Sequence, residues 1–178
     1  MEREKMTTPI LALLAIFSTV IVTSEAEPDS KSRRHEVLHR WSGSWESDVA
    51  IKPAAWTLTG HDASGTTKVQ WILNDQFQQV SVNLGEHETR EIRRFDRKSN
   101  EYHKWTFNSD GATSFWIGSW DQKTSTMTWA YVDFGLGLNG EISDQFTGGD
   151  TFESKMLLMD GTGNILMDVL STHRRTRP

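Results

Sequence analysis

Hydrophobic and polar side chains alternate along most of the chain, which is the pattern of strands with two different faces. Between residues 79 and 84, for example, Val80, Val82 and Leu84 share one face of the predicted strand. The alternation recurs as far as residue 173, and turn-forming residues separate the segments. We predict strands at 45–52, 66–73, 79–84, 89–95, 101–107, 113–120, 124–132, 140–146, 151–159 and 164–173.

The connections between these strands are short, so neighbouring strands are expected to pair antiparallel. About ten strands in one domain expose sheet edges unless the sheet closes or folds over. We therefore predict an all-β fold, an antiparallel up-and-down barrel of about 8–10 strands, preceded by a short helix. A two-sheet sandwich remains the alternative, because the connection 134–140 is long enough to cross between sheets.

The chain begins with a segment typical of a secretory signal peptide. An uncharged run over residues 10–22 follows Arg3 and Lys5, and Ser24 and Ala26 provide small residues for cleavage after Ala26. We predict a signal peptide at 1–26, a lead-in and short helix at 27–37, and the barrel domain at 38–178. The helix is expected from Ser32 to about residue 40. Cleavage would make the protein secreted or periplasmic, whereas an uncleaved segment would be an anchor.

Composition excludes several classes of protein. The net charge of −5 argues against a basic nucleic-acid binder, and the lack of cysteine excludes disulfides and thiolate metal sites. Sequence signatures of hydrolases, zinc proteases and nucleotide-binding loops are missing. The glycine-rich segment 135–140 lacks the Lys and following helix of a phosphate loop, so we interpret it as a loop between strands. No cofactor and no metal are predicted.

The eight Trp residues and the aromatic strand faces are the main candidates for a binding site. Such side chains suit an apolar or ring-bearing ligand inside a barrel, although they also suit a filled core. His103 shares its predicted face with two aromatic residues and could orient a ligand or transfer protons. The candidate ligand-binding set is Trp71, His103, Trp105, Phe107, Met127, Trp129 and Tyr131.

Other polar residues have simpler interpretations. His35 and His39 have the spacing of two metal ligands on a helix but lack an obvious third ligand, which favours a solvated helix face. The strand at 86–94 carries charges on both faces, so we expect an exposed edge or a strand that projects past the barrel rim. It could also serve as a contact surface for an anionic partner.

The pattern of Gly43-x-Trp45 after a short helix, followed by a meander and a final basic pair, resembles lipocalin-like, or calycin, barrels. That resemblance implies that Trp45 closes the barrel beneath Arg174 or its neighbour Arg175, through a cation–π contact. More closely, segments such as 71–77, 118–121 and 173–175 resemble a bacterial lipocalin-like family called domain of unknown function 1579. No catalytic residues follow from that family.

A barrel group related to these families, the nitrobindins, binds haem through a His on the last strand, three residues before a basic pair at its end. Here that position is Leu170, and His173 lies next to the pair instead. Positions 170 and 173 face opposite sides of a strand, so haem binding is not expected.

Together these observations predict an exported lipocalin-like barrel that binds a small, partly apolar ligand, with no nucleic-acid partner and no stable membrane span. One alternative is an enzyme that pairs His103 with a carboxylate in the barrel. Another is a filled barrel that acts as an interaction module.

Overall fold

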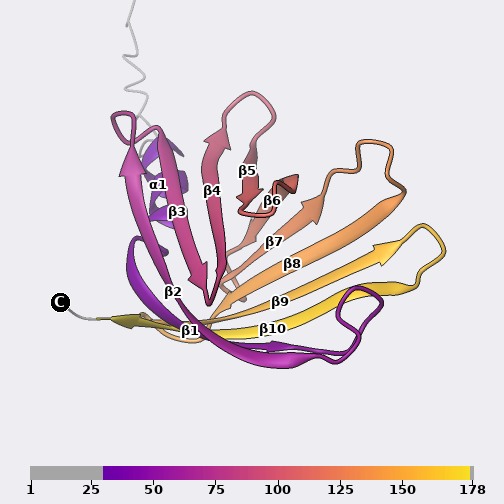
Figure 1. Ribbon diagram of the computed structural model, residues 1–178. Helices are drawn as coiled ribbons and strands as arrows, with labels where there is room; N and C mark the ends of the chain where they lie inside the picture. The colour runs from indigo at the N-terminus through magenta and orange to yellow at the C-terminus, as the bar shows by residue number, and fades with distance from the viewer. Residues whose placement is uncertain (1–29, 177–178) are drawn as a thin grey trace, which may run out of the picture.

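The computed structural model describes residues 30–176, and the predicted signal peptide lies outside these residues. One helix, α1 (Ser30–His39), precedes ten strands (Figure 1). In the described residues, no helix is long and apolar enough to cross a membrane. The strands are β1 (Gly43–Ile51), β2 (His61–Ile72), β3 (Phe77–Leu84), β4 (His87–Asp96), β5 (Glu101–Asn108), β6 (Thr113–Asp121), β7 (Thr126–Tyr131), β8 (Leu138–Phe146), β9 (Thr151–Asp160) and β10 (Ile165–Thr176).

Each strand pairs antiparallel with the strands before and after it in the chain, and β1 pairs with β10 to close the sheet. The prediction of an up-and-down barrel is confirmed, and the sandwich is excluded. Closure removes the edges that an open sheet would leave unpaired. Alternate residues of every strand therefore face the interior.

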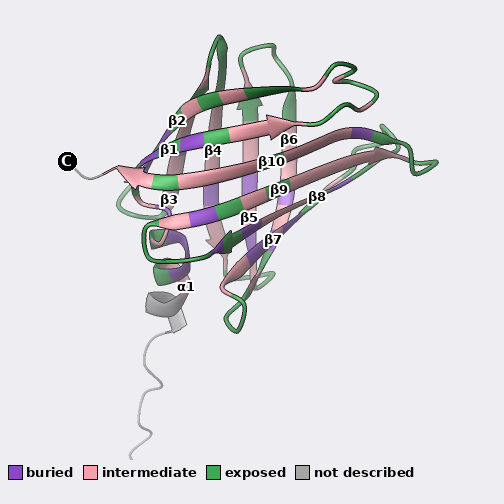
Figure 2. Ribbon diagram, turned by 90° about the horizontal axis from the view of Figure 1, so that it is seen from below, coloured by how far each residue is buried: buried purple, intermediate pink, exposed green. Residues whose placement is uncertain are grey.

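The barrel has two different ends. One, which we call the helix end, carries α1 and the connections 73–76, 97–100, 122–125 and 147–150 (Figures 1 and 2). The other, the far end, carries the connections 52–60, 85–86, 109–112, 132–137 and 161–164. This arrangement follows from the meander, because successive hairpins turn at opposite ends.

The helix end is closed by residues at the end of α1 and just after it. Leu38 is 1% exposed and Trp41 is 2% exposed. The Trp45 indole donates a hydrogen bond of 2.7 Å to the Trp41 carbonyl, and the Gln78 amide donates one of 2.7 Å to the Leu38 carbonyl. The Trp45 bond satisfies a backbone carbonyl just after the helix, and the Gln78 amide is a second donor to the Leu38 carbonyl, which also accepts from the Trp41 amide.

Arg175 fastens this closure to the last strand. Its guanidinium lies over the Trp45 ring, 4.1 Å from the ring centroid. It also donates to the carbonyls of Arg40 and Ser42 and pairs with Asp150. The cation at Trp45 is thus Arg175, and Arg174 has no part in the closure. Arg174 points outward because its position alternates with that of Arg175 on the strand, and it pairs with Asp48 on the surface.

The charge-rich strand β4 is neither an edge nor a projection, which corrects the interpretation from sequence. It pairs with β3 on one side and β5 on the other. Its alternate residues divide the charges between two environments. Glu88, Arg90 and Arg94 lie on the outer wall, whereas Glu91 and Arg93 face the interior, where Arg93 is only 7% exposed. Two charged residues of this strand therefore belong to the inside of the barrel.

Candidate functional site

The interior of the barrel is built in layers along its axis. Next to the helix end lies a layer of aromatic side chains in edge-to-face contact, including Trp41, Trp45, Phe146 and Phe152. Trp129 lies beyond this layer and fits closely because residue 118 is glycine. A Cβ at Gly118 would fall 2.6 Å from the Trp129 ring. This part of the interior is filled.

Two residues further along several strands, the side chains become polar. We call this group the inner polar cluster: Ser47, Glu91, Arg93, Lys104, Asp144, Ser154, Ser171 and His173. On the strands that contribute to this cluster, successive inward-facing residues change from apolar to polar, as from Tyr102 to Lys104 and from Phe146 to Asp144. Charged side chains from β4, β5 and β8 therefore lie close together inside the barrel.

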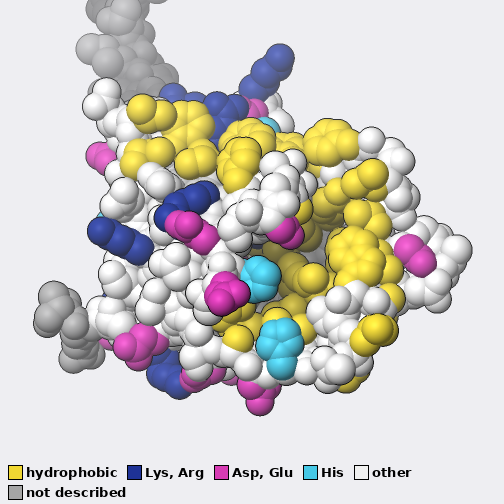
Figure 3. All heavy atoms as spheres, in the orientation of Figure 1, with side chains coloured by type: hydrophobic (Ala, Val, Ile, Leu, Met, Phe, Trp, Pro, Cys, Tyr) yellow, Lys and Arg dark blue, Asp and Glu magenta, His cyan; other side chains and the backbone are white. Residues whose placement is uncertain are grey.

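Beyond the inner polar cluster, the inward-facing side chains are incompletely buried and of two kinds. Those of β4, β5 and β6 include the polar Thr89, Thr106 and Ser114. The apolar ones are Val49, Val82, Tyr131, Ile142, Met156 and Val169. Inward-facing side chains cannot be reached through the hydrogen-bonded wall, so solvent enters from the far end. Figure 3 shows the molecule hollowed between its strands, with hydrophobic side chains on the wall of the hollow. The far-end half of the barrel is thus accessible, in contrast to the helix-end half.

Glu91 and Arg93 form an ion pair inside the barrel, in which the Arg93 Nε donates to Glu91 Oε2 at 2.8 Å. Burial alone would raise the pKa of Glu91, but the positive charges of Arg93 and Lys104 hold that pKa below its ordinary value. Arg93 Nη1 is buried and has no hydrogen-bond partner. A buried guanidinium nitrogen without an acceptor is costly, so a ligand atom that accepted from it would be stabilised.

Lys104 is 2% exposed, and its ammonium lies 4.8 Å and 5.1 Å from the ring centroids of Trp129 and Trp116. Such contacts favour a cation. Burial and the neighbouring charge of Arg93 lower the pKa of Lys104, while the charges of Glu91 and Asp144 oppose that shift. No carboxylate of the described residues lies within 4.0 Å of this ammonium. Lys104 is therefore a second cationic donor in the interior, held by ring contacts and without a carboxylate in direct contact.

Asp144 and His173 complete the inner polar cluster. Asp144 accepts hydrogen bonds from the Trp129 indole at 3.2 Å and from the Ser154 hydroxyl at 2.6 Å. The two ring nitrogens of His173 lie 2.7 Å from Ser47 Oγ and 2.9 Å from Ser171 Oγ. Burial lowers the pKa of His173 to about 4, although Asp144 opposes the shift. The imidazole is therefore neutral at neutral pH.

His103, Trp105 and Phe107 do not line the interior, which corrects their assignment as ligand-binding residues. They lie on the outer wall, where His103 and Trp105 pack against Phe115, and Phe107 is 47% exposed. Both faces of β5 carry aromatic residues, so alternation alone could not decide which face is inside. The interior face is the one with Lys104, because two Trp rings and two carboxylates compensate the buried cation.

The other predicted residues divide between core and hollow. Met127 and Trp129 face inward and are fully buried, so they fill the barrel. Tyr131 packs against Trp116 and is only half-buried, which places it on the wall of the far-end hollow. Trp71 lies at the helix end, stacked on His35, and its indole donates to His39 Nδ1 at 3.2 Å. It is covered by α1 and is remote from the hollow.

His35 and His39 therefore contact Trp71. The described residues contain no cluster of three or more potential metal ligands.

Leu170, at the position of the haem-binding His in the nitrobindins, faces outward and is 38% exposed.

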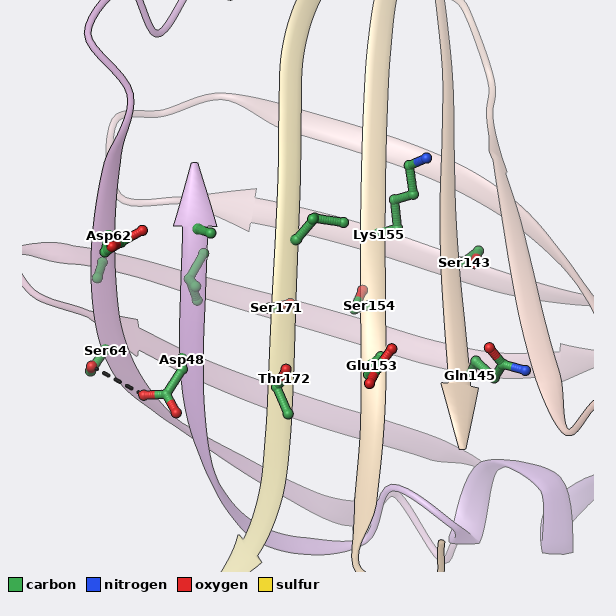
Figure 4. A pocket seen from close by; sticks show the side chains of 14 residues that line it. Asp48, Asp62, Ser64, Ser143, Gln145, Glu153, Ser154, Lys155, Ser171 and Thr172 are labelled. Atoms are coloured by element: carbon green, nitrogen blue, oxygen red, sulfur yellow. Dashed lines mark hydrogen bonds between the residues drawn. The ribbon is translucent and has the colours of Figure 1, made fainter. Parts of the chain in front are cut away.

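The wall also carries a groove of about 720 Å³ on its outer surface (Figure 4). It crosses β2, β1, β10, β9 and β8, and its side chains are mainly polar, among them Asp62, Glu153 and Lys155. Asp48 in this groove already contacts Ser64 and Arg174. A second groove of about 580 Å³ lies beside α1 and β5 to β7. Neither groove contains buried donors like those of the interior, so the interior is the better candidate site.

Comparison with solved structures identifies the architecture. The S-type phycobiliprotein lyase CpeS from Guillardia theta has a TM-score of 0.56 and 14% identity, covering 85% of this chain and 99% of its own. Rv2717c from M. tuberculosis has a TM-score of 0.63 and 12% identity, covering 80% and 96%. The fold is a closed ten-stranded antiparallel barrel of the lipocalin-like type.

This lipocalin-like barrel matches no protein-family model and no curated protein sequence. The predicted membership of domain of unknown function 1579 is therefore not confirmed. At such low identities the similar structures establish the fold alone, so any function must be argued from the interior of this chain.

The sequence-based search missed the inner polar cluster. Lys104 was the available signal, because it shares its strand face with Tyr102 and Thr106 instead of with charged residues. Glu91 and Arg93 gave no such signal, since their strand carries charges at both parities. Only the pairing of β4 on both sides reveals that they are inside.

Proposed function

We propose that the barrel binds a small, partly apolar molecule in its far-end hollow, with a polar group of that molecule on the inner polar cluster. The observation that carries the proposal is the combination of a solvent-accessible, partly apolar hollow with two buried cationic donors. Arg93 Nη1 has no hydrogen-bond partner, and the Lys104 ammonium lies against the rings of Trp116 and Trp129. Ligand sites commonly join apolar walls to a few fixed polar groups in this way.

The donors define the kind of polar group. Both are cationic, so an acceptor such as a carboxylate is better suited than a second donor. Val82, Ile142 and Val169 provide apolar wall for the remainder of the ligand. The likeness to a phycobiliprotein lyase supports small-molecule binding at the level of fold.

The test is a panel of fatty acids, sterols and aromatic carboxylic acids, with Trp emission and thermal unfolding as measurements. We expect at least one class to change the emission and raise the melting temperature. Val169→Trp should fill the hollow and weaken binding about tenfold or more. Leu170→Trp is the matched control, because the neighbouring residue points outward. Unchanged affinity in Val169→Trp, or no response to any class, would contradict the proposal.

Lys104→Met separates the polar contact from the apolar one. It should weaken the binding of a carboxylic acid about tenfold while leaving the corresponding alcohol nearly unaffected. Equal losses for acid and alcohol would mean that the variant disturbs the barrel instead of removing a specific contact.

An enzyme with a histidine and a carboxylate inside the barrel is the second candidate. His103 is unsuitable because it lies on the outer wall. His173 is placed better, since Ser47 Oγ lies 2.7 Å from its Nδ1. However, a pKa of about 4 makes His173 a weak base at neutral pH. The geometry therefore favours binding over proton transfer.

We also propose that the protein is exported, on the basis of the segment 1–26. Expression of the full chain in a bacterial host should yield a product that begins at Glu27 and is found outside the cytoplasm. N-terminal sequencing of the fractions would measure both. An uncleaved product confined to the membrane would contradict cleavage and indicate an anchor.

A further inference from the structure

Exposed apolar side chains are concentrated on neighbouring connections of the far end. Trp56 and Leu58 are 56% and 81% exposed in the connection 52–60, and Phe134 and Leu136 are each 71% exposed in the connection 132–137. Ile165, just after the turn 161–164, is 45% exposed. We call these five residues the rim patch.

The three connections that carry the rim patch are linked to one another through backbone contacts. The backbone amides of Ala55 and Trp56 donate to the carbonyls of Ile165 and Leu166 at 3.2 Å and 3.0 Å. Gly161 lies against the carbonyl of Gly137, so the third connection joins the same surface. The strand order places β1, β10, β9, β8 and β7 side by side, which makes these connections consecutive around the rim (Figure 1).

Many backbone groups of the connections that carry the rim patch have hydrogen-bond partners within those connections. Ala54 and Thr57 exchange backbone hydrogen bonds, and the Asp133 carboxylate accepts from the amides of Leu136 and Gly137. The Asp160 carboxylate likewise accepts from the amides of Thr162 and Asn164. A loop can enter an apolar phase only when its peptide groups have such partners. The apolar side chains here thus stand on loops whose polar groups are already engaged.

The charged residues around the rim patch indicate which kind of partner surface it would bind. Lys52 is the only basic residue in the connections 52–60, 132–137 and 161–164, and it pairs with Asp168 at 3.0 Å. A surface without free basic residues gains nothing from anionic headgroups. Separate protruding side chains also suit a deformable lipid layer better than a rigid protein surface. Trp56 adds an amphipathic ring of the kind that sits at lipid interfaces.

We propose that the rim patch docks on an electrically neutral lipid bilayer, inserting Trp56, Leu58, Phe134, Leu136 and Ile165 around the entrance to the hollow. The docking rests on the rim alone. Its consequence, that an apolar ligand passes between membrane and barrel without crossing water, rests on the proposed function.

The lack of cysteine makes a site-specific test possible. An environment-sensitive fluorophore is attached to Leu58→Cys or Leu136→Cys in the full chain, and phosphatidylcholine vesicles are added. Leu73→Cys is the matched control, because Leu73 is 68% exposed but lies at the helix end. The local readout separates the rim from any contact made by residues 1–26.

We expect the emission at positions 58 and 136 to shift to the blue and rise at least about twofold with vesicles, and that at 73 to stay unchanged. Spin-labelled lipid should quench the first two only. Replacing Trp56 and Phe134 with Ser should weaken the response of the probe at 136 about tenfold, because two large apolar contacts are lost.

Other outcomes overturn the proposal. Equal responses at all three positions would show that the rim has no special role. A requirement for phosphatidylglycerol would contradict docking on a neutral surface. A blue shift that rises with protein concentration in the absence of vesicles would identify a second copy of this chain as the occupant. Failure of the ligand panel alone, with positions 58 and 136 still responding to vesicles, would remove the proposed function and leave the docking.

Discussion

At the scale of single residues, the interior of this barrel contains ionised side chains whose loss of hydration is compensated by nearby groups. Each buried charge has a specific compensation: Arg93 has the Glu91 carboxylate, Lys104 has two indole rings, and Asp144 has an indole and a hydroxyl. His173 instead loses its charge, because its two ring nitrogens meet serine hydroxyls and burial disfavours the imidazolium. The titration of His173 is therefore one that the stability of the fold can report.

The pKa of His173 predicts a loss of stability in mild acid. The folded state holds this pKa near 4, below the ordinary value of 6.5, so the unfolded chain takes up the proton first as the pH falls. The free energy of unfolding should decrease between pH 6.5 and 4, by about 3 kcal/mol from this residue. Asp144 on β8 and Glu91 and Arg93 on β4 are the charged groups that influence the shift.

The measurement is urea unfolding of wild type and His173→Gln at pH 7, 5.5 and 4.5. The variant should show a flatter dependence on pH, whatever its absolute stability, because glutamine does not titrate. The pKa of Glu91 is lowered in the folded state, so the stability that this carboxylate contributes is lost only as the pH falls from the ordinary glutamate pKa of 4.5 toward that lower value. Parallel slopes for both proteins between pH 7 and 5.5 would contradict the assignment to His173.

At the scale of elements, one arginine holds together three parts of the chain. Arg175 on β10 reaches the Trp45 ring on β1, the carbonyls that follow α1, and Asp150 in the connection between β8 and β9. Within residues 30–176 its neighbour Arg174 pairs only with Asp48, and both of those side chains are about 60% exposed. Adjacent residues of the same type thus have different structural roles because a strand alternates its faces.

This difference predicts unequal effects of the same substitution. Arg175→Met should lower the free energy of unfolding by about 2–4 kcal/mol, because it removes the cation–π contact and the donors to two part-buried carbonyls. Arg174→Met should change it by less than about 0.5 kcal/mol, as expected for a surface pair. Chemical unfolding of both variants under one set of conditions measures the difference. Equal effects would show that the closure does not depend on Arg175.

At the scale of the whole molecule, closure of the sheet is what makes the charged interior possible. Because β1 pairs with β10, every strand has two neighbours and no backbone edge faces solvent. The same closure separates a filled, aromatic half from an accessible half. The two ends then differ: α1 covers one (Figure 2), and the apolar rim patch lies along one side of the other.

Removal of the last strand tests this dependence. A chain that stops after residue 164 lacks β10 and exposes the edges of β1 and β9. We expect it to lose its soluble monomer and to associate through those edges. Size-exclusion chromatography with light scattering measures the result, and a chain that stops after Thr176 is the control because it retains all ten strands. A soluble, folded monomer from the shorter chain would contradict the importance of closure.

The sequence by itself determined the strands and their order, because alternation and turn residues are local signals. It also indicated the closure at Trp45, although it could not choose between Arg174 and Arg175. Only the tertiary structure decided which face of β5 is inside, since both faces carry aromatic side chains. Only it showed that Glu91 and Arg93 are buried and that the far end is hollow. Burial of a charge depends on partners from distant strands, and no local pattern records which residues those partners will be.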